Sequence, residues 1–98
     1  MWPFRGNING VVLSQSQDLP MVIENFTLVN MTGGSVVCNV YLIKDSRTVV
    51  IAPYGGTINA NGIYTSEIPR VLEKGEQIKL ATSGLVDYDF EINNLEIP

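Results

Sequence analysis

The chain has 98 residues and a net charge of −4, with 45% hydrophobic residues, 16% charged residues and no histidine. This length fits one domain with one hydrophobic core, and so apolar a composition excludes a disordered chain. The six basic residues are scattered, so we expect no binding to nucleic acid, which requires several Lys or Arg side chains on one surface. No apolar run approaches membrane-spanning length, and the first residues lack the apolar core of a signal peptide. We therefore expect synthesis in a cytoplasm and no membrane partner.

The absence of histidine also limits the chemistry that the chain can perform. It removes Ser-His and Cys-His nucleophile pairs, histidine-bound metals and a general base that titrates near neutral pH. The glycine pairs Gly33–Gly34 and Gly55–Gly56 are typical of turns rather than of a phosphate-binding loop. Cys38 lies in an apolar run and is expected to be a small buried hydrophobic residue. We predict no catalytic, cofactor-binding or metal-binding residues, and a protein that is not an enzyme.

Residues 1–6 are predicted to form an extended N-terminal arm, and residues 7–98 a β-sandwich domain. The proline after Trp2 biases that residue toward an extended backbone. Two positions are open to the arm: Trp2 and Phe4 fold back over this domain's own sandwich, or they dock in a groove of a partner. Trp and Arg are expected to dominate such a contact, so Trp2, Phe4 and Arg5 are candidate partner-binding residues.

Short alternating runs separated by Gly, Asn, Asp or Ser turns follow the arm, and no segment holds a 3.6-residue period. This spacing is typical of a sandwich or barrel. We predict an all-β fold, a single antiparallel β-sandwich of Ig-like or jelly-roll-like type with about seven to eight short strands. The predicted strands are Ile8–Ser14, Met21–Asn30, Val36–Ile43, Thr48–Ala52, Ile63–Thr65, Gln77–Thr82 and Val86–Ile92.

Two of these strands, Met21–Asn30 and Val36–Ile43, are apolar on both faces. We predict that they form a central strand pair whose second face is covered. The cover is either loops of the same chain or another subunit, because exposed apolar patches of this kind usually mark partner sites. In the second case Val37, Tyr41 and Ile43 are candidate partner-binding residues.

The last strand alternates most clearly, with apolar residues at even positions and Asp87, Asp89 and Glu91 at odd positions. One face therefore belongs to the core and the other to solvent. The carboxylates are compatible in spacing with a two-carboxylate glycosidase, but a solvated strand explains them without any further assumption. A calcium loop is disfavoured because an extended strand does not cluster oxygen ligands.

Gln77–Thr82 and the last strand are predicted to form a hairpin. A three-residue loop, Ser83–Leu85, keeps the apolar residues of both strands on one face. It sets Leu80 opposite Tyr88, Ile78 opposite Phe90 and Lys79 opposite Asp89. The last pair would be an exposed cross-strand ion pair that contributes about 0.2 to 1 kcal/mol.

Three segments, Phe26–Asn30, Val36–Ile43 and Val71–Ser83, resemble the small β-sandwich structural proteins of tailed bacteriophages. In those proteins a strand of alternating valines that ends in Tyr-Leu precedes a Leu-x-x-Gly-Asp/Glu-x-Ile hairpin. This chain has Glu76 where Asp is common, and its aromatic N-terminus is unusual for them. The resemblance implies a virion component and carries no catalytic residues.

The expected function is that of an auxiliary or decoration capsid protein, located in the virion on the capsid surface and synthesised in the host bacterial cytoplasm. It would bind the major capsid protein on the outer shell and stabilise contacts between its copies. One alternative is a tail, connector or fibre-associated protein that forms a homo-oligomer on its own. Another is a carbohydrate- or receptor-binding module that uses Tyr41, Tyr54 or Tyr64 as stacking platforms.

Overall fold

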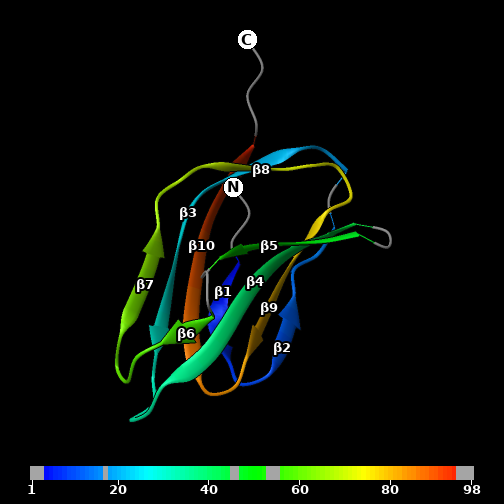
Figure 1. The fold of residues 1–98 in the computed structure, drawn as a ribbon. Coiled ribbons are helices and arrows are strands. Elements are labelled where there is room, and N and C mark those ends of the chain that lie inside the picture. Colours follow the sequence, from blue (N-terminus) through cyan, green and yellow to red (C-terminus); the bar gives the residue numbers. More distant parts are fainter. Residues whose placement is uncertain (1–3, 17, 45–46, 53–55, 95–98) are drawn as a thin grey trace.

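The computed structural model describes residues 4–16, 18–44, 47–52 and 56–94, and all regular structure in these ranges is β-strand. Two antiparallel sheets of five strands each pack face to face, so the predicted β-sandwich is confirmed (Figure 1). In chain order the strands are β1 (Phe4–Ile8), β2 (Val11–Leu13), β3 (Met21–Asn30), β4 (Val36–Lys44), β5 (Arg47–Ala52), β6 (Thr57–Ile58), β7 (Ile63–Ser66), β8 (Arg70–Leu72), β9 (Gln77–Thr82) and β10 (Val86–Asn94).

The strand order identifies which kind of sandwich this is. Sheet A has the order β1-β10-β3-β7, with β8 also paired to β3, and sheet B has the order β2-β9-β4-β5, with β6 also paired to β4. The strand pairs β1/β2, β3/β4 and β9/β10 therefore each place one strand in each sheet. Two packed sheets with these strand orders, between which the chain crosses repeatedly, form a jelly roll. The jelly-roll alternative therefore describes the topology, and the Ig-like alternative does not.

The first predicted strand, Ile8–Ser14, is wrong as a single element. The chain leaves sheet A after β1 and enters sheet B at β2, turning at Asn9–Gly10. Gly10 adopts a φ of 130°, a backbone conformation that glycine tolerates and side chains disfavour. Thr82 fixes this corner, because its amide donates to the Gly10 carbonyl at 2.7 Å and the Gly10 amide donates to Thr82 Oγ1 at 3.1 Å.

The predicted β9–β10 hairpin is also wrong. β9 pairs with β2 and β4 in sheet B, whereas β10 pairs with β1 and β3 in sheet A. The loop Ser83–Leu85 crosses between the sheets: the Ser83 amide donates to Val37 of β4, and the Leu85 carbonyl accepts from Met31 beyond β3. Three extended residues span about 10 Å, which is the separation of two packed sheets. Both strands turn apolar residues toward one core, but they do so from opposite sides.

The predicted central pair of β3 and β4 does not form, since each strand is central in a different sheet. On β3 apolar residues occur on both faces of the predicted strand because a β-bulge interrupts it. The register against β10 shifts where Glu91 faces Asn25 and Ile92 faces Ile23, which leaves Glu24 as an extra residue in a β-bulge. The bulge inverts the alternation, so buried odd positions before it become buried even positions after it.

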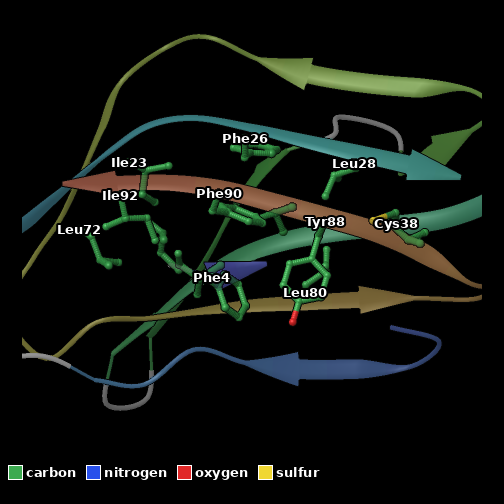
Figure 2. Close-up of a cluster of buried hydrophobic side chains, with 14 of the residues drawn as sticks. Phe4, Ile23, Phe26, Leu28, Cys38, Leu72, Leu80, Tyr88, Phe90 and Ile92 are labelled. Atoms are coloured by element: carbon green, nitrogen blue, oxygen red, sulfur yellow. The ribbon is translucent and has the colours of Figure 1, made fainter. Parts of the chain in front are cut away.

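Four aromatic rings occupy the centre of the core (Figure 2). Phe90 of β10 stacks on Phe26 of β3 with ring centroids 4.7 Å apart, and Phe4 of β1 lies 4.9 Å from Tyr88 and 5.2 Å from Phe90. Each such pair contributes about 0.5–1.5 kcal/mol beyond the area that it buries. Phe4 is therefore part of this domain's own core, as in the first of the two positions considered for the arm. Residues 4–6 of that segment belong to β1, and residues 1–3 lie outside the described ranges.

Asn30 is a polar residue that is 1% exposed at the end of β3. Its Nδ2 lies 2.7 Å from the Gly34 carbonyl, 3.0 Å from that of Ile58 and 2.9 Å from that of Asn59. Its Oδ1 accepts from the amide and the hydroxyl of Thr32 at 2.9 and 2.8 Å. The side chain thus satisfies backbone groups of two loops and ties sheet A to β6 at the edge of sheet B.

Candidate interaction surface

The outer faces of the two sheets differ in chemistry, and the strand register defines both. The central row of the outward side of sheet B runs across four strands, from Leu13 through Lys79 and Tyr41 to Val50. The neighbouring rows place Val11 beside Ala81 and Asn39, and Gln77 beside Ile43 and Thr48. We call this surface face B; its members are Val11, Leu13, Val37, Asn39, Tyr41, Ile43, Thr48, Val50, Gln77, Lys79 and Ala81.

Face B is mainly apolar although it faces outward. Val11 is 57% exposed, Leu13 52%, Val37 49% and Val50 55%, and they come from three different strands. Single exposed apolar residues are normal on a soluble protein, but a contiguous apolar area usually marks an interaction site. The strands β2, β9, β4 and β5 lie side by side in sheet B (Figure 1), so the register brings these residues onto one surface.

Lys79 lies in the middle of face B and is its single charge among the described side chains. Its Nζ lies 5.5 Å from the centroid of the Tyr41 ring, in the geometry of a cation–π contact. Leu13 lies beside it on β2, so the ammonium is set among apolar neighbours. The predicted partner of Lys79, Asp89, lies on the outer face of the other sheet, so the predicted ion pair does not form.

The outward side of sheet A, here called face A, carries more charge than face B, although Ile63 and Val71 on it are exposed apolar residues. The register places Arg5 beside Asp89 and Asn7 beside Asp87, with Asn25 donating to Glu91 Oε2 at 2.8 Å. Its members are Arg5, Asn7, Val22, Asn25, Thr27, Val29, Ile63, Thr65, Val71, Asp87, Asp89, Glu91 and Asn93. The three carboxylates lie on an exposed strand surface rather than in a cleft, as the solvated-strand interpretation describes.

The six predicted partner-binding residues therefore separate in the fold. Val37, Tyr41 and Ile43 share face B, Arg5 is exposed on face A, and Phe4 is 8% exposed in the core. Trp2 lies outside the described residues. The structure adds the exposed residues of β2 and β5 to the first group; a run of three residues in β2 is too short for its alternation to be informative.

Two of the three tyrosines proposed as stacking platforms in the sugar-binding alternative lie in the described structure. Tyr41 carries Lys79 over its ring, and Tyr64 turns toward Phe26 with centroids 6.0 Å apart. Tyr54 lies outside the described residues.

Two grooves open where β5 of sheet B faces β7 and β8 of sheet A. The larger has a volume of about 270 Å³ and is lined by Leu42, Lys44, Val49, Arg70, Val71, Glu73 and Glu76. The smaller has about 100 Å³ and is lined by Ile23, Phe26, Ile51, Tyr64, Ser66, Ile68 and Arg70. Both are below the 300–1,000 Å³ typical of small-molecule sites. Glu76 is already engaged, since its Oε1 accepts from the Glu73 amide at 2.7 Å.

Cys38 is fully buried beneath sheet B, and this burial raises the pKa of its thiol to about 11. A thiol that stays protonated is a poor nucleophile and a poor metal ligand. Among the described residues no cluster of three His, Cys, Asp or Glu side chains is arranged to hold a metal ion. Within the same residues no helix is long and apolar enough to cross a membrane.

The sequence matches no known family model and no curated protein. The function is therefore argued from the geometry of face B and face A.

Proposed function

We propose that the chain is a non-enzymatic structural protein of a tailed-bacteriophage virion, a decoration protein that binds the outer capsid shell through face B. In this role it stabilises contacts between neighbouring copies of the major capsid protein. The observation that carries the proposal is the contrast in charge between the two sides of the sandwich: Lys79 is the single charged residue of face B among the described side chains, whereas face A carries Arg5, Asp87, Asp89 and Glu91.

Face B has the chemistry of an adhesive surface. Val11, Leu13, Val37 and Val50 are each about half exposed, and covering them removes apolar area from water at roughly 25 cal/mol per Å². Face A, with its carboxylates, suits the side that stays in contact with solvent. A shell that repeats the same contact many times turns modest single affinities into firm attachment when copies are linked.

The resemblance of Phe26–Asn30, Val36–Ile43 and Val71–Ser83 to phage structural proteins supports the choice of partner. The jelly-roll order of the strands is in keeping with it, since this architecture occurs in viral capsid proteins. The same architecture also occurs in lectins, so the fold supports the proposal by analogy alone.

The experiment is quantitative mass spectrometry of purified particles from the source, counting copies of this chain against the major shell protein. We expect a copy number of the same order as that of the shell protein. A few copies per particle would replace the proposal by a tail or connector role, in which the chain should assemble into a closed ring or trimer on its own. Complete absence from particles would overturn the virion role and favour saturable binding to host glycans.

A further inference from the structure

The position of Lys79 on face B indicates what kind of surface binds there. Leu13 and Tyr41 flank it in the sheet, and its Nζ lies 5.5 Å from the Tyr41 ring centroid. The Tyr41 ring therefore covers one side of the ammonium group. Within the described part of the chain Lys79 forms no ion pair with a carboxylate.

A partner that covers the apolar residues of face B also covers Lys79, because Lys79 lies in the same row between Leu13 and Tyr41. An ammonium group removed from water without a counter-charge is strongly destabilising. The neighbouring members of face B, which include Asn39 and Gln77, are neutral and cannot neutralise it. The counter-charge must therefore come from the partner.

We propose that the partner surface is a protein surface on which apolar side chains surround one Asp or Glu carboxylate, and that this carboxylate pairs with Lys79. The inference rests on the proposed function and specifies the capsid-shell surface that face B recognises. Lys79 is then the residue that sets the orientation of the chain on the shell, since the apolar contacts around it have little directional preference.

A second copy of this chain is the competing occupant of face B. Stacking face B on face B offers Lys79 only neutral residues or another lysine. Face A of a second copy does offer a carboxylate beside apolar residues, since the register sets Asp87 next to Val29, which pairs with the exposed Ile63. Stacking face B on face A is however a head-to-tail contact, which joins copies into rings or filaments and does not attach each copy to a shell. An amide between Lys79 and Asp87 of another copy in the coupling test below would overturn the inference. A phosphate-rich polymer or an anionic membrane does not fit, because face B has one cation and the chain carries a net charge of −4.

The first test is zero-length coupling on particles. Particles stripped of this protein are incubated with the wild-type chain, treated with a water-soluble carbodiimide, digested and mapped by mass spectrometry. The reagent joins an amine to a carboxylate only where the two are in contact. We expect an amide between Lys79 and an acidic residue of the shell protein, and none to Lys74, which is exposed in the turn between β8 and β9. Binding without any Lys79 coupling would overturn the inference and leave the proposed function intact.

The second test compares three substitutions at the same position by their affinity for stripped particles. Lys79→Glu should weaken binding at least about tenfold, while Lys79→Arg should retain it. Lys79→Met removes the charge but keeps the apolar side chain, so its effect depends on the partner. If a partner carboxylate pairs with Lys79, the substitution leaves that carboxylate buried without a counter-charge and weakens binding. If there is no such carboxylate, the substitution removes only the cost of desolvating the ammonium and strengthens binding. Unchanged thermal unfolding shows that each variant folds. Stronger binding by Lys79→Met overturns the inference, and failure of the wild type to bind overturns both it and the proposed function.

Discussion

Face A and face B are formed by strands that bury the same kind of residues, but their central strands β10 and β4 expose different kinds. On β10 the outward positions are Asp87, Asp89 and Glu91, as expected for a sheet in water, whereas on β4 they include Val37 and Tyr41. The inward residues of both sheets already form one closed core, so folding does not require the outward residues of β4 to be apolar. Their apolar character is better explained by a contact outside the domain.

The largest effect should come from the core that both faces share. Phe90→Ala removes the ring that stacks on Phe26 and contacts Phe4, and should lower the free energy of unfolding by about 3–5 kcal/mol. Urea denaturation measures it, with the exposed Thr65→Ala on face A as a control expected within about 0.5 kcal/mol of wild type. If the two variants were equally stable, the core would not be what holds the two faces in place.

A smaller loss of stability is expected where Asn30 joins the sheets. Asn30→Ala removes the amide group that donates to the carbonyls of Gly34, Ile58 and Asn59, of which the bond to Ile58 is buried, and should cost about 1–3 kcal/mol. Asn25→Ala is the matched control, because its amide donates to Glu91 at the surface, and it should cost less than about 0.5 kcal/mol. Equal losses for the two asparagines would contradict the role given to Asn30.

The contrast between the faces can be tested with one pair of substitutions. Val50→Glu on face B and Ile63→Glu on face A each replace an exposed apolar strand residue, 55% and 68% exposed in the folded chain. We expect Val50→Glu to weaken binding to stripped particles at least about tenfold and Ile63→Glu to leave it unchanged. Circular dichroism melts check that both variants fold. The reverse pattern would assign the contact to face A.

The smallest effect concerns Cys38 and appears only at alkaline pH. Burial raises its pKa from 9.0 to about 11, so the folded chain keeps the thiol protonated where the unfolded chain loses the proton. The corresponding stability is complete below pH 9 and is lost as the pH rises toward 11. Wild type should therefore lose more stability than Cys38→Val over this interval, as measured by denaturation at each pH. Parallel curves would show that the thiol is not desolvated.

Most strand positions could be predicted from the sequence because alternation reports burial directly. The predicted strands Gln77–Thr82 and Val86–Ile92 are confirmed as β9 and most of β10, and Val37, Tyr41 and Ile43 lie on one outward face. Alternation does not indicate which strands pair with each other. The sequence therefore predicts a hairpin of Gln77–Thr82 with Val86–Ile92 in one sheet, whereas these two strands lie in different sheets.

Two local features of the backbone could not be predicted from the sequence. The bulge at Glu24 inverts the alternation of β3, and the turn at Asn9–Gly10 divides one predicted strand between two sheets. Face B as a whole depends on register across four strands, so its members in β2 and β5 emerge only from the fold. The same holds for Lys79, whose setting between Leu13 and Tyr41 is created by pairing residues that are distant in sequence.

The most direct test of the central claim is hydroxyl-radical footprinting of the chain, free and bound to stripped particles, with mass spectrometry reading the oxidation of each side chain. We expect binding to protect Leu13, Tyr41 and Val50 on face B while Ile63 on face A stays as reactive as in the free chain. Protection of Ile63 with unchanged labelling of face B would contradict the account.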